Sequence, residues 1–187
     1  GSIIANEVSM GRVGILNTNL ERCGVANTIV SRAEGTALCN KLFKKSSIRF
    51  DKILVDAPCS GEGTLRKSPK TFNMWNLNMI KKIAATQKRL AEAAVKVLSI
   101  GGEMIYSTCT LAPEENEMII DYLLSKFDLE VESINLPLKY RKGVCSWEGE
   151  ELSEECENCL RLYPQDNDTD GFFVALLVKK SEKGCLR

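Results

Sequence analysis

Histidine is absent from this sequence of 187 residues. Its absence excludes a Ser-His-Asp triad, a Cys-His nucleophilic pair and zinc held by imidazole. Any acid–base chemistry must therefore come from carboxylate, lysine, cysteine or tyrosine side chains. Net charge is absent too, because 25 Lys and Arg residues balance 25 Asp and Glu residues. Affinity for nucleic acid would need a local basic patch rather than an overall positive field.

Long apolar runs are lacking as well, and none approaches the length that crosses a membrane. No signal-peptide pattern opens the sequence. The eight cysteines are spaced irregularly, without the framework of a small secreted disulfide protein. We therefore expect free thiols in a reducing, cytoplasmic environment and no membrane partner. Cys156 and Cys159 have the spacing of half a zinc site, which by itself is too little to predict a metal.

The residues that are present suit one globular domain, with 44% hydrophobic and 27% charged side chains. Strand-like and helix-like stretches alternate along the chain, which is typical of an α/β protein with a doubly wound sheet. We predict strands over residues 3–5, 28–30, 50–55, 104–106, 129–134 and 172–178. We predict helices over residues 10–23 and 80–98 and from residue 113 onward, and an irregular acidic stretch over residues 135–158.

Two of the predicted strands lead into motifs that contain cysteine. Residues 53–61 read ILVDAPCSG, and residues 101–110 read GGEMIYSTCT. The apolar character of the first strand predicts burial on both faces, and the Gly-Gly pair of the second predicts a tight turn. In open α/β sheets, ligands bind in the crevice at the carboxyl ends of the strands. We therefore expect Asp56, Cys59 and Cys109 to reach such a crevice and to support covalent chemistry.

Thiols at such a position become nucleophiles when the thiolate is populated, which needs polar surroundings. Cys109 has Ser107, Thr108 and Thr110 as neighbours. One reaction that uses two thiols and a carboxylate is substitution at carbon 5 of a pyrimidine. A thiolate adds at carbon 6, a carboxyl group stabilises the ring charge, and a base later removes the carbon-5 proton.

A resemblance to a known family is carried by three motifs. They are residues 56–64 (DAPCSGEGT) with Arg66 and Lys67, residues 106–111 (YSTCTL) and residues 113–117 (PEENE). Together they closely resemble the Nop/Sun RNA (cytosine-5) methyltransferases. Further matches cover nearly the whole chain: residues 4–7 (IANE), Arg12, residues 22–25 (RCGV), residues 161–164 (RLYP) and residues 169–173 (TDGFF). The resemblance implies a Rossmann-like core with a mostly parallel sheet and an antiparallel last strand.

The resemblance also implies roles for individual side chains. Cys109 would be the nucleophile on carbon 6 of cytosine, and Cys59 would assist product release. Asp56 would contact the base and lie beside the cofactor, S-adenosylmethionine. Glu7 would bind the ribose hydroxyls of that cofactor, as a carboxylate at a strand end does in nucleotide-binding sheets. Arg12 and Glu34 would also bind the cofactor. At the position of Glu34 the family usually has Asp.

RNA, either tRNA or rRNA, is the partner that the resemblance implies. Arg66, Lys67 and Lys70 are interleaved with Phe72 and Trp75, a pattern that can contact phosphates and stack on single-stranded bases. A solvated charged surface is the alternative. Glu114, Glu115 and Glu117 are interpreted as residues that favour a helix start.

One part of the family pattern is not found. The proline- and glycine-rich cofactor loop after the family's first strand has no counterpart, and Gly1 falls near the start of the family's second strand. We therefore interpret residues 1–187 as a partial catalytic core. Two alternatives stay open: a DNA-type cytosine-5 methyltransferase with Cys59 as nucleophile, and a non-catalytic RNA-binding or assembly subunit. A cysteine hydrolase is less consistent with the lack of histidine.

Overall fold

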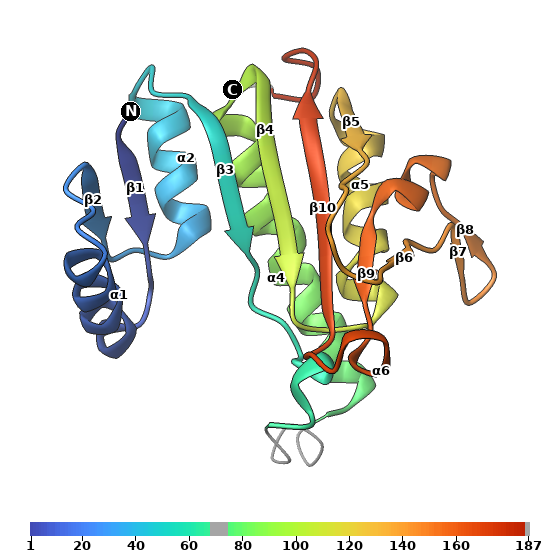
Figure 1. Ribbon diagram of the computed structural model, residues 1–187. Helices are drawn as coiled ribbons and strands as arrows, with labels where there is room; N and C mark the ends of the chain where they lie inside the picture. Colours follow the sequence, from blue (N-terminus) through green and yellow to red (C-terminus); the bar gives the residue numbers. More distant parts are fainter. Residues whose placement is uncertain (68–74, 186–187) are drawn as a thin grey trace. The chain divides into compact units, whose positions relative to one another are not determined.

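The computed structural model describes residues 1–67 and 75–185 of the chain. Two compact units are present, Gly1–Ser47 and Ile48–Arg187, and each is described by itself. Figure 1 gives the labels of the helices and strands. Among the helices of the described residues, none has the length and apolar character needed to cross a membrane.

The first unit consists of two strand–helix repeats. Its elements are β1 (Ile3–Asn6), α1 (Met10–Arg22), β2 (Thr28–Ser31) and α2 (Gly35–Lys45). Strands β1 and β2 pair in parallel, with Ile3 opposite Thr28. Helix α1 ends before Gly24, whose φ of 66° lies in the left-handed region that glycine adopts readily. The predicted strands and the first predicted helix of this region are confirmed.

The second unit is built around a six-stranded sheet in the order β3-β4-β10-β9-β6, with β5 also paired to β10. Its strands are β3 (Phe50–Asp56), β4 (Leu98–Thr108), β5 (Leu129–Glu132), β6 (Arg141–Lys142), β9 (Leu160–Leu162) and β10 (Phe172–Lys179), with a separate hairpin of β7 (Ser146–Trp147) and β8 (Glu150–Glu151). Strands β3 and β4 are parallel, and β10 is antiparallel to β4. The predicted α/β fold with an antiparallel last strand is confirmed.

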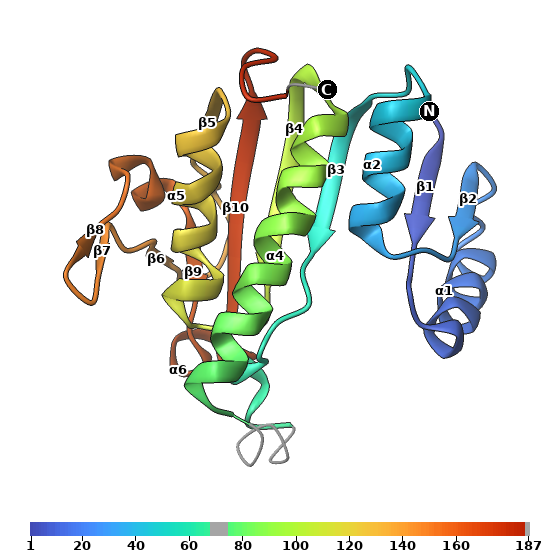
Figure 2. The ribbon, with the colours of Figure 1, turned by 180° about the vertical axis from the view of Figure 1, so that it is seen from behind.

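Helices α4 (Leu77–Val97) and α5 (Glu117–Lys126) lie on one face of this sheet, as Figure 2 shows. The buried face of α4 contains Ile80, Ala84 and Ala91, which matches the predicted apolar stripe. Between α4 and the sheet lies a core that includes fully buried Tyr106 and Phe173, whose rings meet edge to face at 6.4 Å. Short helices complete the unit: η1 (Glu62–Thr64), η2 (Pro113–Glu115), η3 (Glu154–Asn158) and α6 (Pro164–Asn167).

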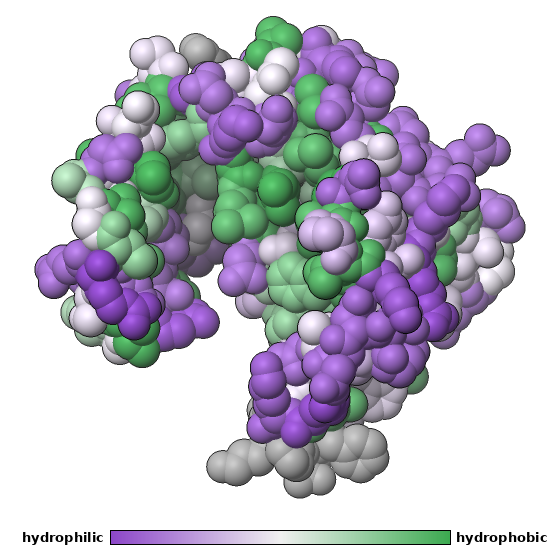
Figure 3. Space-filling model, viewed as in Figure 1, coloured by the Kyte–Doolittle hydropathy of each residue, from purple (hydrophilic) through white to green (hydrophobic). Residues whose placement is uncertain are grey.

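Two predictions about the central strands are wrong. Strand β3 is not buried on both faces, because α4 and α5 of the second unit cover the face of the sheet on which Val55 is 6% exposed. Leu54 of β3 is 69% exposed and its partner Ile105 of β4 is 38% exposed, and Figure 3 shows apolar surface over these strands. The Gly101-Gly102 pair does not form a turn into a strand either. It lies inside β4, beside a bulge in the β3–β4 register, where Gly101 has a φ of 76°.

A buried ion pair joins α5 to β9. Arg161, 4% exposed in its side chain, donates from Nε and Nη2 to the two carboxylate oxygens of Glu117 at 2.6 Å each. Its Nη1 donates to the Leu111 carbonyl at 3.0 Å, and the Val144 amide donates to Glu117 at 3.1 Å. This arrangement satisfies both charges and fixes the segment after β4 against the sheet.

A second buried cation, Lys179 at the end of β10, lies at the other end of the core. Its Nζ donates to the carbonyls of Leu98 at 2.8 Å and Val95 at 3.3 Å, at the end of α4. It also pairs with Glu182 at 3.1 Å. A cation at this position complements the negative end of the helix dipole.

Arg161→Met would leave the Glu117 carboxylate buried without its cation. We expect the free energy of unfolding to fall by about 3–5 kcal/mol in urea denaturation, because an unpaired buried charge is costly. Arg141→Met is the matched control, since its pair with Asp166 is exposed and should contribute little. Adding Glu117→Leu to Arg161→Met should recover much of the loss. A single Arg161→Met variant as stable as the parent would contradict this account.

Candidate active site

The parallel pairing of β3 with β4 brings their carboxyl ends to the same edge of the sheet. The register runs from Ile53 opposite Met104 to Asp56 opposite Ser107, and the Ala57 amide continues it by donating to the Ser107 carbonyl at 3.0 Å. The two cysteine motifs leave the sheet directly after these last pairs. The residues that follow each strand therefore emerge side by side.

The sulfur atoms of Cys59 and Cys109 are 2.7 Å apart at this edge. The Cys109 amide also donates to the Cys59 sulfur at 3.3 Å, and both side chains are partly exposed. All eight cysteines are free, as predicted. The structure thus brings together the two thiols that the sequence placed at neighbouring strand ends, within hydrogen-bonding distance of each other.

The two thiols of this pair differ in pKa, so Cys59 holds its proton more tightly than Cys109 does. The hydrogen bond from Cys59 lowers the pKa of Cys109 from its ordinary value of 9.0 to about 7, against the opposing effects of burial and of the charges of Asp56 and Glu115. The same hydrogen bond, together with burial, raises the pKa of Cys59. The shared proton therefore stays on Cys59, and Cys109 carries the thiolate near neutral pH.

Buried polar groups fix the turn that carries Cys109. The Thr108 hydroxyl bonds to Asn116 Oδ1 at 2.6 Å, and the Asn116 amide group donates to the Thr110 carbonyl at 3.1 Å. The Gly63 amide donates to the Cys109 carbonyl at 2.9 Å. A side chain at Gly63 would meet the backbone of Gly171 at 2.3 Å, so glycine is needed for this close approach.

Two residues that sequence reasoning did not assign to the site hold the turn that carries Cys59. Buried Glu115 accepts from the Ser60 amide at 3.0 Å, and buried Gln87 donates to the Pro58 carbonyl at 2.8 Å. Gln87 could have been noticed as a polar residue in the apolar stripe of α4. Nothing in the motif around Glu115 separates it from its neighbour Glu114. Glu115 and Glu117 do stand at helix starts, but both are completely buried rather than solvated.

Asp56, the third residue predicted for this edge, ends β3 and is exposed. Its negative charge opposes ionisation of Cys109, which places the carboxylate within electrostatic reach of that thiol. A carboxylate, a thiolate and a thiol thus share one edge of the sheet in the second unit.

The predicted cofactor residues Glu7, Arg12 and Glu34 belong to the first unit. Glu7 Oε1 accepts from the Ser9 amide and from Arg12, both at 2.8 Å, and the Ser9 contact is the main reason that the pKa of Glu7 is lowered. Arg12 therefore acts on Glu7 and orients it. Glu34 caps α2, with Thr36 and Ala37 amides donating to its two oxygens. That contact is an N-cap, a structural role that the sequence analysis did not predict.

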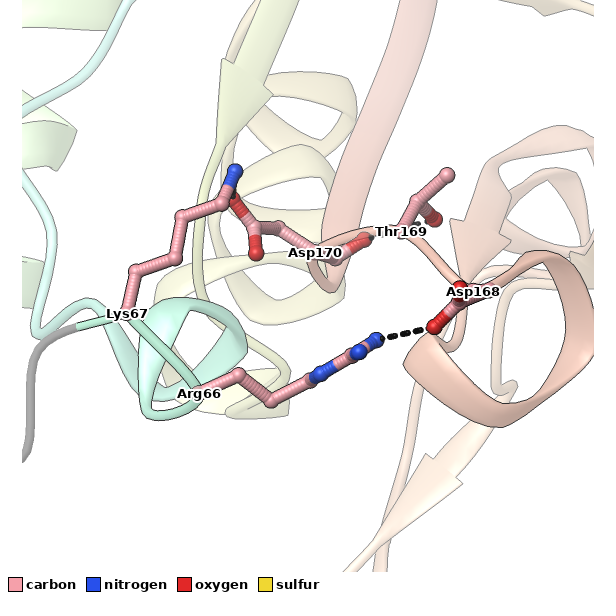
Figure 4. A pocket seen from close by; sticks show the side chains of 5 residues that line it. All are labelled: Arg66, Lys67, Asp168, Thr169 and Asp170. Atoms are coloured by element: carbon pink, nitrogen blue, oxygen red, sulfur yellow. Dashed lines mark hydrogen bonds and ion pairs between the residues drawn. The ribbon is translucent and has the colours of Figure 1, made fainter.

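The predicted basic surface is partly neutralised by acidic neighbours. Arg66 pairs with Asp168 and Lys67 with Asp170, both at 2.7 Å, and Figure 4 shows these pairs spanning a pocket of about 200 Å³. An adjoining cavity of about 350 Å³ is lined by Arg66, Asp168 and the Pro164–Gln165 segment. Exposed ion pairs of this kind are weak, so other anions can compete for the two cations. Predicted contacts at Lys70 and Phe72 lie outside the described residues.

The remaining cysteine pattern shows no ligand geometry. Cys156 and Cys159 are buried, and burial raises the pKa of both thiols, that of Cys156 to about 12. Within residues 1–67 and 75–185, no group of three or more cysteine, aspartate or glutamate side chains is arranged to hold a metal ion. Because their pKa values are raised, the Cys156 and Cys159 thiols are poor nucleophiles at neutral pH.

The amino-acid sequence of the chain is similar to those of known RNA methyltransferases. A family model described as 16S rRNA methyltransferase RsmB/F matches residues 1–178. The tRNA (cytosine(49)-C(5))-methyltransferase of Pyrococcus abyssi is 41% identical over 179 residues, which cover 96% of this chain and 56% of that protein. Ribosomal RNA small subunit methyltransferase F of Vibrio cholerae is also 41% identical over 179 residues, which cover 96% of this chain and 36% of that protein. The chain thus spans 36% to 56% of the length of these relatives.

Solved structures agree with the sequence comparison. A methyltransferase homolog protein from Pyrococcus horikoshii superposes with a TM-score of 0.79 at 40% identity, over 96% of this chain and 53% of its own. NSun6 from Pyrococcus horikoshii, solved with SFG, gives a TM-score of 0.77 at 31% identity, over 97% of this chain and 42% of its own. Both similarities extend across the two units described above.

Cys59→Ala removes the hydrogen bond that lowers the pKa of Cys109. We expect the pH of half-maximal alkylation of Cys109 by iodoacetamide to rise from about 7 toward the ordinary thiol value of 9.0. Because only the thiolate reacts, the rate rises with pH in both proteins. Peptide mass spectrometry measures it, with exposed Cys23 as an internal reference. An unchanged profile for Cys109 would show that Cys59 does not set its pKa.

Proposed function

The chain belongs to the 16S rRNA methyltransferase RsmB/F family, and on this premise we propose that it methylates carbon 5 of a cytosine in RNA through a covalent bond to Cys109. The observation that carries the proposal is the pairing of the Cys59 and Cys109 sulfurs at 2.7 Å. Relatives named for tRNA and for ribosomal RNA are both 41% identical to this chain, so the proposed substrate class is RNA of either kind. Such RNA and the free thiols fit the cytoplasmic location expected from the sequence.

S-adenosylmethionine is the methyl donor that we propose, and when bound it supplies an electrophilic methyl group on a sulfonium. Glu7, directly after the carboxyl end of β1, fits the ribose of such a donor, because a carboxylate at that position can accept hydrogen bonds from ribose hydroxyls. Its contacts with the Ser9 amide and with Arg12 hold the carboxylate at Oε1. Arg12 would hold the carboxylate in place, and Glu34 would approach the adenine from its position at the start of α2. Asp56 is proposed to contact both cofactor and base.

The proposed reaction begins with addition of Cys109 to the ring. The thiolate attacks carbon 6, the sulfur–carbon bond forms, and the electron pair of the carbon 5–carbon 6 double bond becomes available at carbon 5. Ring nitrogen 3 would take up a proton as the thiolate adds, and the Asp56 carboxylate would accept a hydrogen bond from the resulting N–H and so stabilise the activated base. Carbon 5 would then acquire the methyl group, and the methyl–sulfur bond of the donor would break to leave a neutral thioether. A Cys109 thiol with a pKa of about 7 is half ionised at neutral pH and needs no histidine.

Release of the product would fall to Cys59. A base removes the proton from carbon 5, the carbon–hydrogen electron pair restores the ring double bond, and the sulfur–carbon bond breaks to return Cys109 as a thiolate. The largest cause of the raised pKa of Cys59 is its hydrogen bond to Cys109. In the adduct the Cys109 sulfur is a neutral thioether, so this cause is weakened and Cys59 ionises more easily. Cys59 would thus become a base when one is required.

RNA would reach the site as an unstacked nucleotide, because the attacked carbon is inaccessible within a helix. Arg66 and Lys67 are proposed to bind phosphates at the pocket of Figure 4, in exchange for their ion pairs with Asp168 and Asp170. Lys70 is proposed to join them. This exchange would make the contact dependent on salt concentration.

Trapping with RNA that carries 5-fluorocytosine tests which thiol attacks. Fluorine at carbon 5 cannot leave as the proton does, so the adduct persists. We expect Cys109→Ala to reduce the denaturation-resistant adduct on the order of a thousandfold or more, as loss of a nucleophile does. Cys59→Ala should retain the adduct, and Cys23→Ala is the control thiol. If Cys59→Ala alone abolishes the adduct, the DNA-type alternative with Cys59 as nucleophile is correct.

Calorimetric titration with S-adenosylhomocysteine tests the cofactor assignment. In the longest native polypeptide that contains residues 1–187, Glu7→Gln should weaken binding about 10- to 100-fold, the worth of one hydrogen bond to a charged group. Glu21→Gln on α1 makes the same charge change in an exposed residue and should leave binding unchanged. Absence of binding by the unaltered polypeptide would favour a non-catalytic RNA-binding or assembly subunit.

A further inference from the structure

Gln87 is a neutral polar residue on the buried face of α4, where most of its neighbours are apolar. Its Nε2 donates to the Pro58 carbonyl at 2.8 Å and to Glu115 Oε2 at 2.9 Å. The first contact holds the residue directly before Cys59. The second joins α4 to the turn that precedes α5.

Glu115 completes the arrangement from the other side. The same carboxylate oxygen accepts from the Ser60 amide at 3.0 Å, so it holds the residue directly after Cys59. The Glu115 carbonyl accepts from the Tyr106 hydroxyl at 2.7 Å, and Tyr106 belongs to β4, the strand that leads to Cys109. The backbone on both sides of Cys59 is thus tied to one buried pair of side chains, which is itself tied to the strand of the second thiol.

From this geometry we propose that Gln87 and Glu115 are positioning residues that hold the Cys59 thiol against Cys109. The inference rests on the proposed function, because that function gives the two thiols their roles in the reaction. No hydrogen bond among the described residues joins Gln87 or Glu115 to either sulfur. The pair instead fixes the Pro58 carbonyl and the Ser60 amide. Because both neighbours of Cys59 are held, the Cys59 backbone is held in the position that places its sulfur beside Cys109.

Further contacts link the two cysteine turns directly. The Ser60 and Thr110 hydroxyls bond to each other at 2.9 Å, and the Thr110 hydroxyl also lies 3.1 Å from Glu62 Oε2. Ser60 and Thr110 are both buried. A sulfur–sulfur distance is sensitive to small shifts of either turn, so holding the turns together on both sides matters for a hydrogen bond between thiols.

Burying the polar side chains of Gln87 and Glu115 costs free energy, and the packing of α4 on the sheet does not require it. Gln87 Oε1 and Glu115 Oε1 are buried and have no hydrogen-bond partner among the described residues. Burial raises the pKa of Glu115. Apolar side chains of the same shape would join α4 to the sheet without these unsatisfied atoms. The pair is therefore better explained by the backbone groups that it holds than by the stability of the helix interface.

Gln87→Met is the decisive variant, because it removes the donor without changing charge or size. Glu115 variants are less informative, since the charge of Glu115 itself raises the pKa of Cys109. In Gln87→Met we expect the pH of half-maximal alkylation of Cys109 to rise above 7. At pH 7 the rate should fall by up to about 50-fold, the ratio of thiolate fractions for pKa values of about 7 and 9.0.

Lys179→Met is the matched control. It removes a buried donor from the carbonyls at the C-terminal end of α4, more than two helical turns from Gln87, and should leave the alkylation profile of Cys109 unchanged. A folded Gln87→Met protein with an unshifted profile would overturn the inference. An equal shift in Lys179→Met would overturn it as well, because general destabilisation would then explain the effect.

Hydrogen exchange in the unaltered protein tests the inference even if Gln87→Met does not fold. The Ser60 amide, held by Glu115, should exchange on the order of a hundredfold more slowly than the amide of exposed Gly149 in the β7–β8 turn, which makes no hydrogen bond to the described residues. Equal exchange of the two amides would contradict the inference.

The inference and the proposed function can fail separately. Alkylation and exchange require neither RNA nor cofactor, so a shifted profile supports the positioning role even where the unaltered chain forms no adduct with 5-fluorocytosine RNA. In that case the proposed function fails. If the adduct forms and the Gln87→Met profile is unshifted, the positioning role fails and the proposed function stands.

Discussion

The parallel register of β3 and β4 is the constraint on which the candidate site depends. With Asp56 opposite Ser107, both cysteine turns leave the sheet at one edge, and their sulfurs come within 2.7 Å. A hydrogen bond between the two thiols lowers the pKa of Cys109, which accepts it, and raises the pKa of Cys59, which donates it. A shift of the pairing by one residue would turn each side chain to the opposite face and separate the pair. Backbone pairing thus brings together the two thiols of the proposed reaction in a chain that has no histidine.

Buried polar groups are concentrated just after β4, in the segment that controls this edge. Five of the buried polar residues lie between positions 108 and 117: Thr108, Thr110, Glu115, Asn116 and Glu117. Each is bonded to a backbone group or to a partner side chain on another element, and the Glu117–Arg161 pair links the segment to β9. Such networks are costly unless satisfied, but they hold one conformation of a turn more firmly than apolar contacts do. Here they hold the turn that carries Cys109.

Much of the fold followed from the sequence because its signals are local. Apolar runs marked the strands, and the stripe from Ile80 to Leu98 marked α4. The exposure of Leu54 did not follow, because an apolar run does not show whether one face or both faces of its strand are covered. The approach of Cys59 to Cys109 was predicted from strand order. The partners of Glu115, Gln87 and Glu34 were not, since each is bonded to backbone groups whose positions depend on the tertiary structure or on the exact helix start.

The central claim is that Cys59 and Cys109 share one proton, and a direct titration of the pair measures this. In a variant that retains only these two cysteines, the ionisation of each thiol can be followed by carbon-13 NMR of labelled cysteine. The account predicts two well-separated steps, the first near pH 7 on Cys109 and the second above the ordinary thiol value of 9.0 on Cys59. Two coincident steps near 9.0 would contradict it.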